Sequence, residues 1–376
     1  SRQFRLLGLV PGPDVTAESA AALAGSTPAV ATRLLDRLAD ASLLEAHGDG
    51  RYGLHDLIRL FARECALADE SEPERLAARA RWYGYYLQTA DAAVRLLYPT
   101  RLRLLEPPAG GPQFDSRTAA LIWLDSEQAN LVAATIDAAE QQPVELAWLL
   151  ADALRSYLWR RMSIANWKAV TTAGLAAATA AGDLRAQAAM LLGLGLLHLA
   201  VGEHARAVEY NSRAVALSLT TGWQELQAIA LTNLGGSYLE LGWLEHAADQ
   251  FQRALAVNEK LGRGSGQAMS LGNLGSVCLE LGELDRAADY LRQAVARPES
   301  ASAPDGGATH RVNLGETYLS LGDLDAATEQ LTAAIAAAQT ADRQDCQALA
   351  LALLAAVDRE RGQHARALEQ TTAALA

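Results

Sequence analysis

The sequence contains little lysine and little cysteine, and both shortages exclude classes of function. Lys168 and Lys260 are its two lysines, and 44 acidic residues against 32 basic ones give a formal net charge of −12. A protein this acidic is not suited to coating nucleic-acid phosphates. The three cysteines, Cys65, Cys278 and Cys346, fit neither a disulfide framework nor a zinc motif, which is typical of a chain in the reducing cytoplasm.

Several sequence signals are missing altogether. No apolar run approaches the ~18 residues that span a bilayer, and there is no basic-then-apolar leader. The chain has no GxxxxGK[ST] phosphate-binding loop, no nucleophile–histidine set in a known motif and no metal-ligand spacing. We therefore expect a cytoplasmic chain with no membrane contact, no catalytic residue, no metal and no cofactor of its own. Because it opens at Ser1 rather than methionine, we interpret it as a fragment of a longer protein.

What the sequence does contain is a repeat with a period of 40 residues. A Leu-Gly pair recurs, followed at constant offsets by a glycine and by two alanines. The positions are Leu194-Gly195, Leu234-Gly235, Leu274-Gly275 and Leu314-Gly315; then Gly202, Gly242, Gly282, Gly322 and Gly362; then Ala207, Ala247, Ala287, Ala327 and Ala367; and Ala214, Ala254, Ala294, Ala334 and Ala374. A weaker first copy starts near Leu154, so residues 151–376 are expected to hold about five and a half units.

Each unit predicts two helices. Gly242 is suited to end the first helix of its unit, because glycine readily adopts the left-handed conformation found at helix C-termini. Ala247, Phe251 and Ala254 are then spaced along one face of the second helix. A single hairpin of this kind cannot bury its own apolar face, so the hairpins must stack into an α-solenoid.

The order of the markers resembles the tetratricopeptide repeat. The matching positions in one unit are Leu234, Gly235, Tyr238, Gly242, Ala247, Phe251 and Ala254. That family's usual period is about 34 residues, so longer helices are expected here. In the family, the position of Asn233, Asn273 and Asn313 can face a concave groove, where an amide can hydrogen-bond the backbone of a bound peptide. The resemblance implies a protein or peptide segment as partner; the alternative is that these asparagines brace neighbouring helices.

Residues 1–70 predict a small winged-helix domain. A short helix ended by Gly25 and a second helix capped by Ser26, with Pro28 in its first turn, come first. Two short strands around Asp49-Gly50 then form a hairpin. A further helix starts at the His-Asp pair of residues 55–56. Its buried face is predicted from helical spacing to consist of Leu57, Ile58, Phe61 and Cys65.

Residues 71–150 predict a helical linker. Helices are expected over 74–98 and after a capping Ser116, with an irregular connector over 99–114 between them. A further helix is expected to carry Pro143 in its first turn. The predicted fold is therefore mainly all-α: a winged helix with a small β-hairpin, a helical linker, and an α-solenoid of tetratricopeptide repeats.

Winged helices often bind DNA, but the charge of this one argues against it. Residues 1–70 hold seven arginines and no lysine against ten acidic residues, a net charge of −3. The candidate recognition helix carries Arg33 and Arg37 but also Asp36 and Asp40, and phosphate contacts supply most non-specific affinity. Direct nucleic-acid binding is not expected. A DNA-binding winged helix with an oligomerising repeat domain is kept as an alternative.

The segment RYGLHDLIRLFA, residues 51–62, resembles the Met-His-Asp segment of STAND-type signalling ATPases of the NB-ARC class, with Leu54 in place of methionine. In that family the winged helix packs on the nucleotide domain. The resemblance implies that His55 reaches the phosphates of ADP held by a domain outside this chain, and that Asp56 orients the loop. A histidine at a helix start, among unpaired N–H groups, suits an anionic phosphate. The alternative is a plain helix start.

The whole order of segments resembles the C-terminal half of large AfsR-like regulators of the SARP family, the antibiotic regulatory proteins of actinobacteria. The winged helix, the WLDSEQANLVAA segment near Trp123 and the long repeats carry this resemblance. It implies a sensor and autoregulatory module of a transcriptional activator of secondary-metabolite biosynthesis. The parent protein would then hold an ATPase that binds ADP or ATP. The alternative is a stand-alone peptide-binding scaffold without an ATPase.

Overall fold

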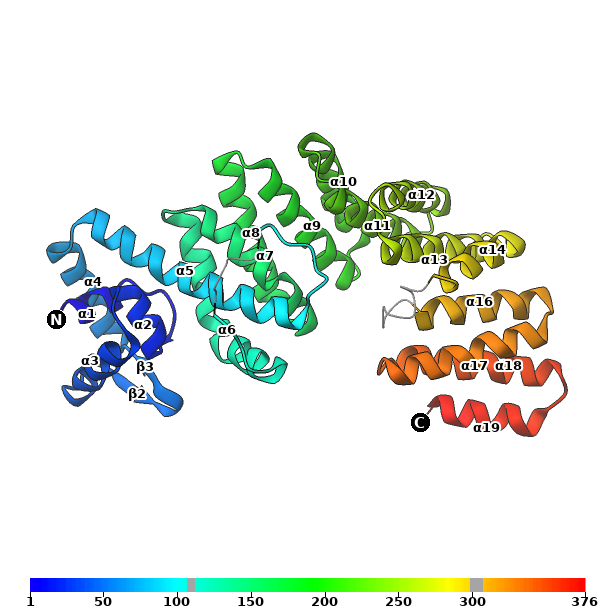
Figure 1. The fold of residues 1–376 in the computed structure, drawn as a ribbon, viewed down its shortest axis with the longest axis horizontal. Coiled ribbons are helices and arrows are strands. Elements are labelled where there is room, and N and C mark those ends of the chain that lie inside the picture. The colour runs from blue at the N-terminus through cyan, green and yellow to red at the C-terminus, as the bar shows by residue number, and fades with distance from the viewer. Residues whose placement is uncertain (107–111, 298–306, 376) are drawn as a thin grey trace. The chain divides into compact units, whose positions relative to one another are not determined.

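The computed structural model describes residues 1–106, 112–297 and 307–375, and most of them are helical (Figure 1). This confirms the predicted fold class. The chain divides into two compact units, Ser1–Leu197 and His198–Ala376. Across the described ranges, no helix is both long and apolar enough to cross a membrane.

The first unit begins with a winged helix. Its elements are α1 (Arg2–Leu7), β1 (Asp14–Val15), α2 (Ala17–Ala24), α3 (Pro28–Asp40), β2 (Glu45–His47), β3 (Arg51–Gly53) and α4 (Asp56–Asp69). The strands form an antiparallel sheet in the order β1-β3-β2, with Asp14 opposite Gly53 and Ala46 opposite Tyr52. The predicted hairpin is confirmed, and its turn residues Asp49 and Gly50 have φ values of 63° and 70°.

Sequence patterns missed α1 and β1, because both are too short to show a period. Gly25 ends α2 with a φ of 66°, as predicted. The N-cap of α3 is Thr27, however, and not Ser26. Ser26 belongs to the end of α2, since its N–H donates to the Ala21 carbonyl at 2.9 Å. This bond is part of the usual closure around a left-handed C-terminal glycine.

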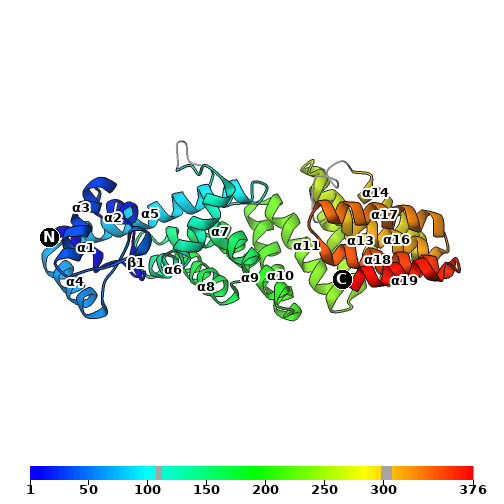
Figure 2. The ribbon, with the colours of Figure 1, turned by 90° about the horizontal axis from the view of Figure 1, so that it is seen from below.

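Four helices continue the first unit: α5 (Glu72–Leu97), α6 (Arg117–Glu140), α7 (Glu145–Arg160) and α8 (Ile164–Ala181). α2 packs on α5, and α5, α6 and α7 contact one another (Figure 2). Trp82, Tyr83 and Tyr86 of α5 are fully buried in this packing. The winged helix therefore packs on the linker through the contact of α2 with the aromatic-rich α5.

The helices predicted within residues 71–150 are present, with one shift at Pro143. Ser116 caps α6, its Oγ accepting from the Ala119 N–H at 3.0 Å. α7 begins at Glu145, so Pro143 precedes the helix instead of lying in its first turn. The connector over 99–114 is irregular where it is described, and residues 107–111 of it lie outside the described residues.

A group of charged side chains joins the wing to the linker. Arg51 of β3 binds Asp14 of β1 at 2.5 Å and Glu127 of α6 at 2.7 Å. Glu127 is 2% exposed and also accepts hydrogen bonds from Tyr86 and Asn130, at 2.8 Å each. Burial by itself would raise the pKa of Asp14, but hydrogen bonds from Arg51 and Asn130 lower it below its usual value. The buried charges are thus paired on every side.

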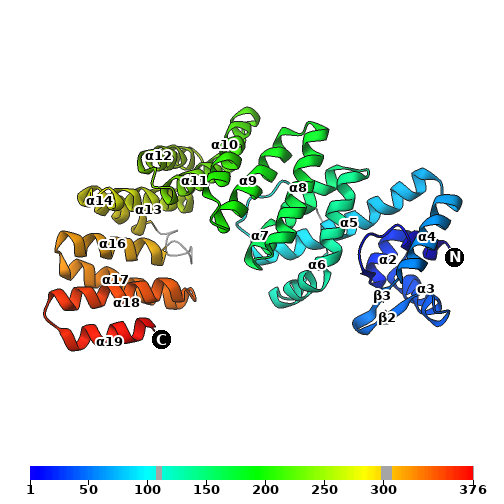
Figure 3. The same ribbon diagram turned by 180° about the vertical axis from the view of Figure 1, so that it is seen from behind.

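The remaining helices form hairpins. They are α9 (Leu184–Ala200), which contains the point of division, and α10 (His204–Thr221), α11 (Gln224–Glu240), α12 (Leu244–Lys260), α13 (Gly264–Glu280), α14 (Leu284–Val295), α16 (Gly307–Leu321), α17 (Leu324–Thr340), α18 (Gln344–Glu360) and α19 (His364–Leu375). Figure 3 shows α16 to α19 stacked in chain order, each in contact with the next.

The geometry of the hairpins explains the 40-residue period. α11, α12 and α13 each have 17 residues and are joined by turns of three residues. Left-handed residues close helices at intervals of 20 positions, or of 40 between Gly282 and Gly322, and they are Gly202, Gly222, Gly242, Gly262, Gly282, Gly322, Asp342 and Gly362. The predicted longer helices are therefore confirmed.

The Leu-Gly signature has a packing cause. A Cβ on Gly235 would lie 2.6 Å from the Phe251 ring, and one on Gly275 would lie 2.5 Å from Leu291. A hydrogen atom at this position lets the large side chain of the second helix reach the backbone of the first. Phe251 and Leu291 are consequently buried to 1% and 0% exposure.

Candidate functional site

The His-Asp pair lies at the N-terminus of α4. His55 is the N-cap residue of this helix and Asp56 is its first residue; both are exposed. The His55 side chain makes no capping hydrogen bond. The N–H groups of the first turn therefore point to solvent, as the N–H groups of any uncapped helix start do. An anion at this position would meet an exposed imidazole and open backbone donors together.

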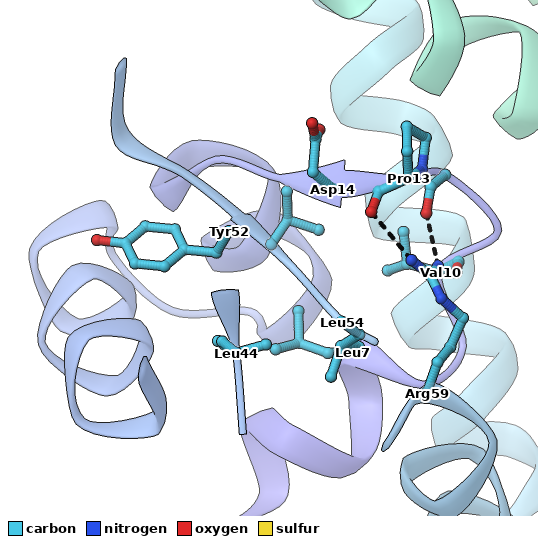
Figure 4. Close-up of a pocket in the computed structure, with 10 residues that line it drawn as sticks. Leu7, Val10, Pro13, Asp14, Leu44, Tyr52, Leu54 and Arg59 are labelled. Atoms are coloured by element: carbon cyan, nitrogen blue, oxygen red, sulfur yellow. Dashed lines mark hydrogen bonds between the residues drawn. The ribbon is translucent and has the colours of Figure 1, made fainter. Parts of the chain in front are cut away.

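Arg59, one turn further along α4, fixes this helix start in place. Its guanidinium donates to the carbonyl oxygens of Val10, Gly12 and Pro13 at 2.8, 2.6 and 3.0 Å (Figure 4). Burial lowers the pKa of Arg59. The hollow beside it, lined by Leu7, Leu54 and neighbours, has a cavity volume of about 10 Å³. Ligand pockets usually measure roughly 300–1,000 Å³, so this hollow is a packing feature and not a nucleotide site.

The predicted buried face of α4 is wrong for Leu57 and Phe61, whereas Ile58 and Cys65 are half-buried. Leu57 and Phe61 are 74% and 57% exposed, and the fully buried residues of the helix are Ala62 and Ala66. The cause lies at the end of α1, where a Cβ on its C-cap residue Gly8 would come within 2.3 Å of the Arg63 backbone. This close approach admits only small side chains, and the large ones are displaced to the flanks. An apolar surface with Leu57, Leu60 and Phe61 therefore lies exposed beside His55.

The three predicted groove asparagines lie one on each of α11, α13 and α16, and each is half-buried. The Asn313 amide donates to Ser276 Oγ on α13 at 2.8 Å, so this residue braces a neighbouring helix. Within the described ranges, the Asn233 and Asn273 side chains have no hydrogen-bond partner. Two of the three amides are thus open to a ligand.

These asparagines lie on the inner layer of the second unit. The first helices of successive hairpins contact each other, α11 with α13, α13 with α16 and α16 with α18, whereas the second helices α12 and α14 barely touch each other in the described residues. On α13 the side chains at helical spacing with Asn273 are Met269, Ser276 and Glu280. Met269 is 47% exposed. We call this stripe, with its equivalents on α11 and α16, the inner face.

Sequence reasoning missed the other members of the inner face because each repeat uses a different residue there. The equivalents of Met269 are Ile229 and Thr309, and those of Glu280 are Glu240 and Ser320. Only the asparagine is identical in all three units. A comparison of positions 40 residues apart by polarity and charge, and not by residue identity, would have revealed these rows.

The winged helix presents mixed charge where a DNA reader would present positive charge. Arg33 and Arg37 of α3 are exposed, but so are Asp36 and Asp40. The Tyr52 hydroxyl donates to Asp36 at 2.6 Å. Among the residues that the structure describes, no group of three or more histidine, cysteine or acidic side chains is placed to hold a metal ion.

Comparison with known proteins gives matches to both parts of the chain. Residues 226–300 and 311–340 match tetratricopeptide repeat models. The chain is 39% identical over 222 residues, 57% of its length, to regulatory protein AfsR of Streptomyces griseus. It is 38% identical over 167 residues to AfsR of Streptomyces coelicolor, 42% of its length. It spans only about a fifth of the length of these relatives, 22% and 17%.

Solved structures show the same fold at low identity. A STAND protein with a tetratricopeptide repeat sensor from Pyrococcus horikoshii aligns with all of this chain and 62% of its own, with a TM-score of 0.55 and 16% identity. Aspartyl phosphate phosphatase F from Bacillus subtilis aligns over 96% of this chain and 94% of its own, with a TM-score of 0.51 and 12% identity. These likenesses concern architecture alone.

Proposed function

We propose that this chain, a homologue of part of the AfsR regulatory proteins that carries tetratricopeptide repeats, is the sensor and autoregulatory module of a cytoplasmic transcription regulator. The repeats receive a protein or peptide segment, from a partner or from the same polypeptide. The winged helix passes the signal to an adjoining nucleotide-binding domain that holds ADP or ATP. By the same likeness, the regulated genes direct secondary-metabolite synthesis. The chain itself catalyses no reaction.

The start of α4 is the observation that carries the proposal. His55 is exposed and unbonded, its helix start is anchored by Arg59, and an uncovered apolar surface adjoins it. An anchored cationic or donor group beside an apolar rim is suited to contact a nucleotide-holding partner. We infer that the apolar surface packs on the nucleotide domain and that His55 reaches the ADP phosphates there, with Asp56 orienting the loop.

The repeats supply the sensor part of the proposal. Asn233 and Asn273 keep free amides on the inner face, and each amide can donate to and accept from the backbone of an extended chain. Asn313 can join them if its amide leaves the hydrogen bond to Ser276 and bonds to a ligand group. The stand-alone scaffold is the rival, because the same face would serve it equally well.

The test uses the full-length parent protein. His55→Ala should release ADP faster and raise basal transcription, since the resting state loses a phosphate contact. His47→Ala, an exposed histidine on the wing of the same domain, is the matched control and should change neither quantity. Wild-type ADP retention and activity in the His55 variant would reject the relay and leave the scaffold.

A gel-shift titration at low salt addresses the DNA-binding alternative. The mixed charge of α3 predicts no shift at micromolar protein, because few phosphate contacts are on offer. A salt-sensitive shift abolished by Arg33→Ala and Arg37→Ala would instead establish the winged helix as a DNA reader.

A further inference from the structure

The inner face is uneven in charge along the helices that form it. α11 and α13 contain no lysine or arginine, and their charged residues are Glu225, Glu240 and Glu280. α16 adds Glu316, which lies one helical turn after Asn313. Arg311 of α16 donates to Gln330 of α17 at 3.2 Å, so its charge is directed to the second helix. The face therefore lacks positive charge beside its amides.

Glu280 lies close enough to Glu316 for its charge to act on that carboxyl. Burial raises the pKa of Glu316, and the charge of Glu280 raises it further. Neither carboxylate, nor that of Glu240, forms an ion pair within the described part of the chain. Glu240 and Glu280 are the last residues of α11 and α13, where the helix dipole adds negative potential. A cation at this edge would relieve both effects.

The opposite edge of the inner face is apolar. Ile229 is half-buried and Met269 is 47% exposed, each one turn before an asparagine. Methionine adapts its shape to varied apolar partners and is common on peptide-binding surfaces. Across α11 and α13 the face thus runs from apolar to amide to carboxylate.

We propose that the inner face takes an extended peptide whose basic side chains meet Glu240, Glu280 and Glu316 and whose apolar side chains meet Ile229 and Met269. The inference rests on the proposed sensor role of the repeats and names the chemistry of the segment sensed. Packed helices lie about 8–10 Å apart, and an extended chain in the polyproline II conformation has three residues per turn and advances about 3.1 Å per residue, so every third side chain points to the same side at a similar spacing. One residue in three therefore meets each successive helix. A basic residue at every third position matches this spacing.

The experiment titrates this chain into fluorescently labelled nine-residue peptides and follows their anisotropy. The first peptide repeats Arg-Ala-Leu and the second repeats Glu-Ala-Leu. The arginine peptide should bind with a Kd at least tenfold lower than the glutamate peptide. Glu280→Gln with Glu316→Gln should raise the Kd of the arginine peptide at least tenfold.

A matched pair of substitutions separates this site from general attraction to an acidic protein. Glu245→Gln with Glu259→Gln on α12 removes the same charge from two exposed positions off the inner face. This control should leave the Kd within twofold of wild type. Circular dichroism melts of all variants verify that they are folded. Equal weakening by both pairs would overturn the proposal, as would failure of the arginine peptide to bind.

Asn233→Ala with Asn273→Ala distinguishes failure of the inference from failure of the sensor role. If the glutamate peptide binds as tightly as the arginine peptide and the asparagine variant abolishes both, the charge preference is overturned and the peptide-binding face stands. If the asparagine variant binds every peptide as the wild type does, the face itself is rejected and the charge proposal falls with it.

Discussion

At the scale of single residues, two histidines show how environment decides what a side chain can do. His55 is exposed at a helix start with its ring free of hydrogen bonds, so it can meet a ligand. His310 of α16 is 6% exposed, and its Nδ1 has no hydrogen-bond partner. Its ring fits only because Gly272 has no Cβ, which would lie 2.1 Å from Nε2. Burial lowers the pKa of His310 to about 4.

The pKa of His310 predicts a pH-dependent stability. The folded-state pKa of about 4 lies below the usual 6.5, so the unfolded chain takes up the proton first. Stability is therefore lost as the pH falls from 6.5 towards 4, by up to about 3 kcal/mol. Urea unfolding at pH 7 and at pH 4 should show that His310→Ala loses about that much less than wild type. Equal losses in the two proteins would mean that His310 titrates normally in the fold.

Replacing the Glu127 carboxylate by an amide should lower the unfolding free energy by a large amount. Glu127→Gln removes one anionic partner of Arg51 in a buried network, which should cost about 3 kcal/mol of unfolding free energy. Asp289→Asn on α14 is the control, because Asp289 and its partner Arg292 are 64% and 57% exposed. That control should cost about 1 kcal/mol or less. Urea unfolding checks both, and similar costs would show that the network contributes no more than a surface pair.

At the scale of the helix, the repeats depend on a small residue facing a large one. Gly235, Gly275 and Gly315 each lie against a large residue of the second helix: Phe251, Leu291 and Leu331. Glycine ordinarily weakens a helix, so its presence here reflects the closeness of the two helices. On α4, too, the close approach of two backbones selects small residues: Ala62 and Ala66 lie at the contact, and Leu57 and Leu60 are exposed.

Two glycines of the repeats should respond to alanine with opposite signs. Gly275→Ala forces a Cβ against Leu291 and should destabilise the second unit by about 1–3 kcal/mol. Gly236→Ala on α11 meets nothing within 4 Å and should stabilise it by about 0.5–1 kcal/mol through helix propensity. Denaturant unfolding monitored by circular dichroism measures both. A stabilised Gly275 variant would disprove the close-packing explanation of the signature.

At the scale of the whole molecule, each unit has a core of its own, but the first unit leaves an apolar surface uncovered. Leu57 and Leu60 are 74% and 55% exposed on α4. They do not stabilise this chain by burial, so a role in contact with a further domain is the function proposed for them. The relay and the inner face occupy separate units and can be tested separately.

The α4 surface predicts different behaviour in the chain and in the parent protein. Leu57→Gln with Leu60→Gln should change the unfolding free energy of this chain by no more than about 0.5 kcal/mol. In the full-length protein the same change should raise basal transcription, because the contact with the nucleotide domain is weakened. Ile122→Gln, at a residue 63% exposed on α6, should affect neither. Unaltered basal transcription in the double variant would refute a buried contact there.

The sequence by itself determined the features that arise from local geometry. The 40-residue period, the left-handed turn at Gly242, the contact of Gly235 with Phe251 and the Asp49-Gly50 hairpin all follow from interactions within one hairpin. Such interactions recur at a fixed spacing along the chain, so the spacing of residues in the sequence is enough to predict them. The likeness to AfsR-like regulators came from the order of these local patterns.

Only the tertiary structure decided which surfaces are covered and which side chains are free. The approach of Gly8 to α4 buries Ala62 and exposes Leu57, which reverses the prediction from helical spacing. Arg51 donates to Glu127, which is 76 positions away in the sequence, and Asn313 of α16 donates to Ser276 of α13. Contacts between distant segments depend on how close two backbones come, and no local pattern of side chains records that distance.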